Sequence, residues 1–161
     1  MARLLSTYTN KIDRKGRVSV PARLRAALAA EQARCSDPGF AGLILFPSLR
    51  AEKVWNGCSG LFIENLVGDI DALDPFGEEA DDFSVILAEA RELPWDGEGR
   101  IVLPPDVIED AGIDGQVMFA GRGAYIEIGA PEVIGERIAL QSRRVRQDPG
   151  RLSRARRKDG A

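Results

Sequence analysis

The stretch Asp13-Arg14-Lys15-Gly16-Arg17-Val18-Ser19-Val20-Pro21 has a second version 83 residues later in the chain. That version is Asp96-Gly97-Glu98-Gly99-Arg100-Ile101-Val102-Leu103-Pro104. Both follow the pattern Asp-x-x-Gly-Arg-x-x-x-Pro, and four identical residues in one ungapped register are not expected by chance. The chain is therefore best read as two related halves.

Each copy has the chemistry of a tight turn that leads into a strand and then into a helix. Asp accepts hydrogen bonds from nearby backbone N–H groups, and Gly supplies the positive φ that a hairpin turn needs. Pro lacks an N–H and suits the first turn of a helix. A good turn explains the Asp and the Gly but not the Arg that follows Gly in both copies. That Arg either caps nearby carbonyl groups or points outward at a ligand.

The first half predicts strands and helices in alternation around its turn. A strand on each side of the turn is followed by a helix that opens at Pro21 and places Leu24 and Leu28 in the core. A short buried strand and a second helix come next. The expected ranges are 4–12 and 17–20 for the flanking strands, 21–30 for the helix, 43–46 for the buried strand and about 47–73 for the second helix.

Asp74-Pro75-Phe76-Gly77 is the best candidate for the boundary between the halves. An acidic helix start follows it, and the pattern of the first half then begins again. The expected elements are a helix start at 78–82, a segment 85–95 leading into the second turn, a strand at 100–103, a helix from Pro104 to Gly112, strands at 117–120 and 125–128, and a last helix from Pro131.

These elements predict an α+β fold of two pseudo-symmetric halves, each with the order β-β-α-β-α. A hairpin of this size cannot bury its apolar face alone. Two halves that pack as a pseudo-two-fold pair would close one small barrel and place both turns on the same side. The expected units are residues 3–74, residues 82–141 and an Arg-rich flexible tail at 142–161.

The composition excludes several classes of function. No run approaches the roughly 18 apolar residues of a membrane helix, and the first residues lack the apolar core of a signal peptide, so we expect a cytoplasmic protein with no membrane partner. The chain has no His, which removes Ser-His-Asp and Cys-His systems and His-based metal sites. Cys35 and Cys58 lack a metal-type spacing and are expected as reduced thiols. We expect no catalytic residue, no metal, no cofactor and no small-molecule substrate.

Charge is distributed unevenly along the chain although the net charge is only −3. Residues 1–34 carry eight Lys or Arg against two acidic residues, and residues 137–161 carry nine against two. The middle, 35–136, carries five against twenty-one. This asymmetry indicates a polyanion partner, or else basic and acidic regions that neutralise one another between subunits.

Three stretches of the chain resemble the MraZ family of bacterial proteins, which are built from two SpoVT-AbrB-type DNA-binding units. They are residues 5–21, 42–47 and 92–104, and the resemblance spans roughly residues 3–140. It implies a swapped-hairpin barrel with flanking helices and a ring-like homo-oligomer associated with the nucleoid. It also implies regulation of the division and cell-wall gene cluster through promoter repeats in double-stranded DNA.

The two turns differ in how well their side chains suit contact with DNA. The first carries Arg14 and Lys15 where the second has Gly97 and Glu98, and phosphate contacts come from Lys and Arg, not from Glu. The candidate DNA-binding residues are Lys11, Arg14, Lys15 and Arg17, of which the resemblance implies Arg17 directly. The candidate structural residues of the turns are Asp13, Gly16, Asp96, Gly99 and Arg100. Whether Arg17 reads a guanine edge or holds a phosphate stays open.

Two other classes of function stay open beside DNA binding. An enzyme would need carboxylate pairs such as Asp69/Asp71 or Asp81/Asp82, but these lie in polar segments without a partnering base or Gly-rich loop, which favours a solvated role. A protein-interaction module, such as an antitoxin with the same barrel, would use a tail that folds on its partner. The duplicated unit favours the regulator over the antitoxin.

Overall fold

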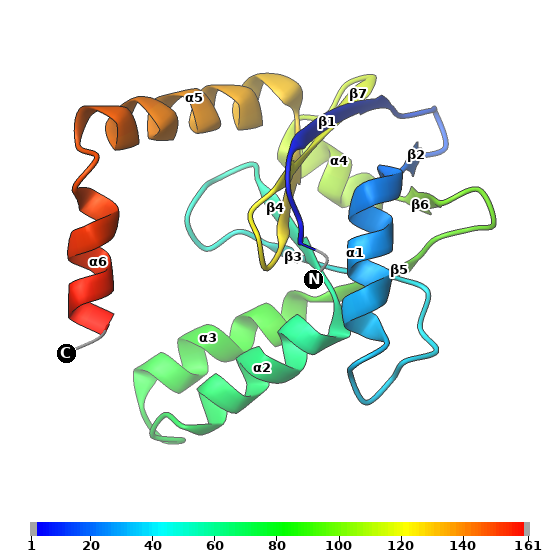
Figure 1. Cartoon of the computed structure of the whole chain (residues 1–161). Helices are drawn as coiled ribbons and strands as arrows, with labels where there is room; N and C mark the ends of the chain where they lie inside the picture. Colours follow the sequence, from blue (N-terminus) through cyan, green and yellow to red (C-terminus); the bar gives the residue numbers. More distant parts are fainter. Residues whose placement is uncertain (1–2, 160–161) are drawn as a thin grey trace.

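Strands from the first half of the chain pair with strands from the second half. The computed structural model describes residues 3–159. Fourteen helices and strands alternate along this range (Figure 1). They are β1 (Thr7–Lys11), β2 (Arg17–Ser19), α1 (Ala22–Gln32), β3 (Gly42–Pro47), β4 (Trp55–Cys58), α2 (Gly60–Asp71), α3 (Glu78–Glu89), β5 (Arg91–Pro94), β6 (Arg100–Val102), α4 (Pro105–Ala111), β7 (Gln116–Gly121), β8 (Ile126–Gly129), α5 (Pro131–Gln147) and α6 (Arg151–Asp159).

A six-stranded antiparallel sheet with the order β1-β7-β8-β4-β3-β5 forms the centre of the fold. β1 of the first half pairs with β7 of the second, β5 of the second half pairs with β3 of the first, and β4 pairs with β8. The predicted α+β class is confirmed. Within the described residues, no helix is both long and apolar enough to cross a membrane.

The predicted closed barrel is not formed by residues 3–159. β1 and β5 lie at the two edges of the sheet, and β2 and β6 form a separate two-stranded pair. Pro21 and Pro104 follow these short strands and turn the chain into α1 and α4, because Pro lacks the N–H needed to extend a ladder. A single bridge, Ile12 to Val18, joins β1 to β2.

The main core lies between one face of the sheet and the layer formed by β2, β6, α1 and α4. Leu24 and Leu28 of α1 are 1% and 0% exposed, which confirms their predicted place in the core. They pack with Val18 and Ile101 from the two short strands and with Phe119 from the sheet. The layer that carries both turns is therefore fixed to the sheet by apolar burial.

Three helices cover the opposite face of the sheet. α2 and α3 pack over Phe46 and Cys58, and α5 packs over Ala120 through Ile134. Burial raises the pKa of the Cys58 thiol well above its ordinary value, so the group stays protonated at neutral pH. The base of α5 is also tied to the sheet, where the guanidinium of Arg137 donates to the buried Glu127 carboxylate at 3.0 Å.

Each half contains one more strand than the β-β-α-β-α order predicts. The range 47–73 was expected to be one helix, but it holds a turn, then β4, then α2, so that prediction was wrong. Gly57 explains the difference, because a Cβ there would lie 3.0–3.2 Å from the side chains of Ile126 and Ile128. The glycine that weakens a helix lets β4 approach β8 closely.

Two further segments differ from their expected form. Residues 85–89, expected to lead into the second turn, end helix α3, and β5 begins at Arg91. Residues 142–159, expected as a flexible tail, continue α5 to Gln147 and then form α6. Arg, which supplies seven of the eighteen residues of this segment, is a strong helix former.

Candidate nucleic-acid interface

The first turn is held by the carboxylate of Asp13. Its Oδ1 accepts hydrogen bonds from the backbone N–H groups of Lys15 and Arg17, each at 2.9 Å. Its Oδ2 accepts from Nε of Arg17 at 2.7 Å. Gly16 has φ +81°, and a Cβ there would lie 2.8 Å from the carbonyl oxygen of Leu103. The Asp, the Gly and the Arg of the motif thus have defined local roles.

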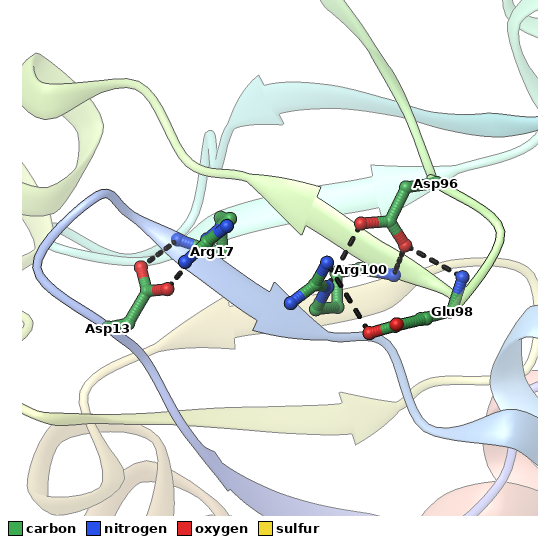
Figure 2. A network of polar contacts seen from close by, with 5 residues as sticks. All are labelled: Asp13, Arg17, Asp96, Glu98 and Arg100. Atoms are coloured by element: carbon green, nitrogen blue, oxygen red, sulfur yellow. Dashed lines mark hydrogen bonds and ion pairs between the residues drawn. The ribbon is translucent and has the colours of Figure 1, made fainter.

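The second turn repeats this geometry (Figure 2). Asp96 Oδ1 accepts from the N–H groups of Glu98 at 2.9 Å and Arg100 at 3.0 Å, and Oδ2 accepts from Nε of Arg100 at 2.9 Å. Gly99 has φ +78°. The duplicated sequence motif therefore forms a duplicated structure.

β2 and β6 form a short antiparallel ribbon between the turns, with Val18 opposite Ile101. These two residues are 83 positions apart and are buried, so the ribbon has a pseudo-two-fold centre. The backbone bonds obey the same symmetry, since Val20 donates to Gly99 at 3.0 Å and Leu103 donates to Gly16 at 2.8 Å. The turns lie at opposite ends of the ribbon, on the side of the molecule away from α6 (Figure 1).

The outer face of the ribbon carries both motif arginines. Because directly paired residues share one face of an antiparallel pair, the register places Arg17 beside Val102 and Arg100 beside Ser19 on the face opposite Val18. The side chains of Arg17 and Arg100 are 39% and 33% exposed. The ribbon therefore presents two guanidinium groups diagonally on one open surface.

The carboxylates hold these arginines in place and are themselves perturbed. Hydrogen bonds from the backbone N–H and then the guanidinium of Arg17 keep the pKa of Asp13 below its ordinary 3.8. Backbone hydrogen bonds, chiefly from Arg100, lower the pKa of Asp96 in the same way. The hydrogen bond to Asp96 raises the pKa of Arg100, with smaller contributions from Glu98 and Asp13. Both aspartates are therefore ionised at neutral pH.

The terminal nitrogens of the two arginines differ in their surroundings. Nη2 of Arg100 forms a 3.4 Å ion pair with Glu98. Within residues 3–159, the terminal nitrogens of Arg17 have no ion-pair partner. Lys11, Arg14 and Lys15 are exposed around the first turn, so this turn concentrates positive charge where the second turn carries a neutralised Arg.

Two residues that the sequence did not single out support the ribbon. Asn10 of β1 donates through its side chain to the carbonyl of Ser19 at 2.7 Å. Arg25 of α1 donates to the carbonyl of Val20 at 2.9 Å and lies against Gly99. In the sequence Asn10 is only a polar residue within a predicted strand, so no sequence signal identified these contacts.

The carboxylate pairs considered for catalysis lie at the surface, where Asp71 and Asp81 line one open hollow of about 290 Å³. Asp69, Asp71, Asp81 and Asp82 are all exposed on α2 and α3. Among the described residues, no group of three or more Cys, Asp or Glu is placed to hold a metal ion.

Comparison with known proteins places the chain in a family, although no family model matches it. "Transcriptional regulator MraZ" of Rickettsia bellii (strain OSU 85-389) is 43% identical over 131 residues, which cover 81% of this chain and 82% of the relative. The protein of the same name from Parvibaculum lavamentivorans is 45% identical over 125 residues, 77% of this chain and 73% of the relative. The chain belongs to the MraZ family. The resemblance carried by the two turns is thereby confirmed. A third MraZ protein, from Rickettsia canadensis, is 43% identical over 129 residues, which cover 80% of this chain and 81% of the relative.

The similarity to MraZ proteins extends over most of the chain. The relatives align with about four fifths of the chain, a share long enough to include both Asp-x-x-Gly-Arg turns. The assignment of Lys11, Arg14, Lys15 and Arg17 to DNA contact stays a prediction about this chain.

Proposed function

We propose that this MraZ-family chain is a transcriptional regulator, not an enzyme, and that it binds double-stranded DNA through the first turn and the outer face of the ribbon. The observation that carries the proposal is the exposed, carboxylate-held Arg17 with three more basic side chains around it. The names of its relatives, each a transcriptional regulator, support it.

The first turn is the principal contact in this proposal. Phosphate oxygens attract Lys and Arg and repel Glu, and Glu98 already pairs with Arg100 at the second turn. Asp13 holds the side chain of Arg17 in place before DNA binds, which lowers the entropic cost of ordering this side chain on binding. The second turn mainly supports the ribbon.

We further propose that the targets are repeats in the promoter of the division and cell-wall gene cluster, read in the nucleoid by several subunits of a ring-like homo-oligomer. One short turn offers few contacts, so a single site binds weakly. Several identical turns on one assembly gain affinity from effective concentration when the DNA repeats are spaced to match. A form held as a monomer should bind multi-repeat DNA no better than single-repeat DNA in a titration on both templates.

The deciding experiment is fluorescence-anisotropy binding to the DNA upstream of the protein's own gene, against a scrambled duplex, at two salt concentrations. Arg17→Ala should weaken binding to the promoter, and Arg100→Ala should largely keep it. Arg34→Ala, at another exposed arginine, controls for the loss of one charge. If Arg17 contacts a base, the loss is about 1–3 kcal/mol and specific to the promoter; if it contacts phosphate, both duplexes weaken and the salt slope falls by about one.

Two results would count against the proposal. Equal losses from Arg17→Ala and Arg100→Ala would show that the two turns act as one symmetric reader. No preference for the promoter at either salt would overturn the regulator proposal and favour the protein-interaction module instead.

A further inference from the structure

Two surfaces of opposite charge remain outside the ribbon and its turns. The first is the acidic hairpin, defined as residues 60–90, which contains α2 and α3 and carries nine carboxylates with no Lys or Arg. The second is the basic arm, defined as residues 143–158, which contains the end of α5 and most of α6 and carries eight Lys or Arg with one Asp. Neither surface has a role in the proposed DNA contact.

The acidic hairpin leaves some of its apolar side chains exposed, although one face of it packs over Phe46 and Cys58. α2 is rich in apolar residues but has no buried residue. Phe76, at the tip between the helices, is 97% exposed, and Phe83 and Val85 of α3 are 41% and 44% exposed. These exposed side chains leave apolar surface on the hairpin that a partner could cover.

The negative charge of the hairpin is not balanced by basic residues at the C-terminal end of α2. The C-terminal end of α2 carries partial negative charge, and Asp69 and Asp71 lie there with no basic residue in the last turn. Asp74 follows in the tip, and α3 begins with Glu78, Glu79 and Asp81. A cationic partner would relieve this repulsion.

The basic arm has exposed positive charge and exposed apolar side chains that could complement those of the hairpin. Every residue from Arg151 to Lys158 is exposed, so this part of α6 buries no residue against the rest of the described chain. Arg151 and Arg154 lie in the first turns of α6, where the helix dipole is positive and no acidic residue is present. Val145 and Leu152 are 57% and 63% exposed among these charges.

The arm is held away from its own hairpin by a defined bend. At residues 148–150, Asp148 accepts from the backbone of Arg151 at 3.1 Å and its carboxylate pairs with Arg154. Arg122 donates to Gln141 at 3.0 Å near the base of the arm. A hollow of about 450 Å³ between α5 and α6 is lined by Arg122, Arg144 and Arg151, with apolar Ile138 and Val145. Figure 1 shows α6 standing clear of the α2–α3 pair.

We infer that the basic arm of one copy docks on the acidic hairpin of a second copy. Carboxylates from the hairpin tip enter the arginine-lined hollow, and the exposed apolar side chains of the two surfaces cover each other. The charges supply orientation and the apolar contacts supply most of the stabilisation. The inference deepens the self-association within the proposed function and is independent of DNA binding.

DNA is the competing partner for the arm, and the structure favours the second copy. α6 and the acidic hairpin both extend away from β2 and β6, the strands of the proposed reading surface (Figure 1). DNA bound at the ribbon would therefore leave the arm unoccupied, and DNA bound at the arm would meet the carboxylates of the hairpin on this side of the molecule.

Charge reversal tests the inference in the full chain without DNA. The arm variant is Arg151→Glu/Arg154→Glu/Arg157→Glu, and the hairpin variant is Glu78→Lys/Asp81→Lys/Asp82→Lys. Each alone should weaken association by on the order of tenfold or more in light scattering coupled to size exclusion, and the combined variant should recover it. Recovery also excludes misfolding as the cause. Glu109→Lys/Glu132→Lys/Glu136→Lys, at exposed positions elsewhere, should leave association unchanged.

Cross-linking identifies which copy provides the hairpin. Lys158 is the only lysine of the arm, so a carbodiimide should join it to carboxylates of residues 60–90. In an equal mixture of ordinary and ¹⁵N-labelled protein, we expect cross-linked peptides of mixed isotope composition. Peptides of a single isotope composition, or no such cross-link, would overturn the inference.

The remaining outcomes separate this inference from the proposed function. An oligomer that none of the reversals affects would overturn the arm contact alone. Unchanged association with weaker DNA binding by the arm variant would assign the arm to DNA. A monomer at every concentration would overturn the inference and also remove self-association from the proposed function.

Discussion

At the scale of single residues, the motif Asp-x-x-Gly-Arg fixes a turn and aims a guanidinium group with one carboxylate. The Asp accepts two backbone N–H groups and one side-chain N–H in each copy. The Arg is therefore both a structural partner of the Asp and a partly exposed cation, and its contact with a ligand stays a prediction. Its position on the ribbon follows from the carboxylate beside it.

The glycines of the two turns should be hard to replace. Gly16→Ala places a side chain at φ +81° and a Cβ 2.8 Å from a backbone oxygen, so we expect a loss of about 1–3 kcal/mol in the free energy of unfolding. Gly99→Ala has similar φ strain, but its Cβ meets the movable guanidinium of Arg25, so its loss should be smaller. Urea unfolding measures both, with Gly97→Ala, which meets no atom within 4 Å, as control. A loss from Gly97→Ala equal to that from Gly16→Ala would contradict this account.

Acid should weaken the two turns through their aspartates. Because the folded pKa values of Asp13 and Asp96 lie below 3.8, their stabilisation is fully present above about pH 4 and is lost as the pH falls through the lowered values. The variant Asp13→Asn/Asp96→Asn should be less stable at pH 7 and should lose less stability than the wild type between pH 5 and pH 2. Urea midpoints across this range measure the difference, with Asp114→Asn, at an exposed position, as control. Parallel curves for wild type and variant would contradict the assignment.

At the scale of elements, local chemistry was enough to predict the turns, the helices that follow Pro21 and Pro104, and the buried strand β3. β4 escaped prediction because Asn56, Gly57 and Cys58 carry no alternation of apolar and polar side chains, and the glycine is explained only by a strand 69 positions away, at Ile126. The supporting contacts of Asn10 and Arg25 escaped for the same reason. Pairing between distant segments decides such positions, and the local sequence does not record it.

Two glycines should respond to alanine in opposite directions. Gly57→Ala adds a Cβ 3.0–3.2 Å from two isoleucine side chains, so we expect a loss of about 1–3 kcal/mol from overpacking between β4 and β8. Gly68, in α2, meets no atom within 4 Å, and Gly68→Ala should stabilise the protein by up to about 1 kcal/mol through helix propensity. Chemical unfolding of both variants checks the signs. Stabilisation by Gly57→Ala would show that β4 does not need the close approach.

At the scale of the whole molecule, the two repeats share one core. β1 pairs with β7, β3 with β5, β4 with β8, and β2 with β6. Among residues 3–159, the only ladders inside a repeat are β3 with β4 and β7 with β8. The main core takes Leu24 and Leu28 from the first repeat and Phe119 and Ile128 from the second. The boundary predicted at residues 74–77 thus separates sequence repeats whose strands fold together.

Separated repeats should consequently be unstable alone and recover when mixed. Residues 1–74 lose the partners of β1, β2 and β4, and residues 75–161 lose the partners of β5, β6 and β8, so each leaves apolar faces in water and unpaired backbone groups. We expect each fragment to show little sheet by circular dichroism and no cooperative unfolding, and an equimolar mixture to regain both. The same mixture with Ile101→Asp should not recover, because the ribbon would then bury an unpaired charge opposite Val18. A fragment that folds cooperatively alone, as a monomer or as a homodimer, would show that one repeat can supply for itself the pairing that this structure takes from the other.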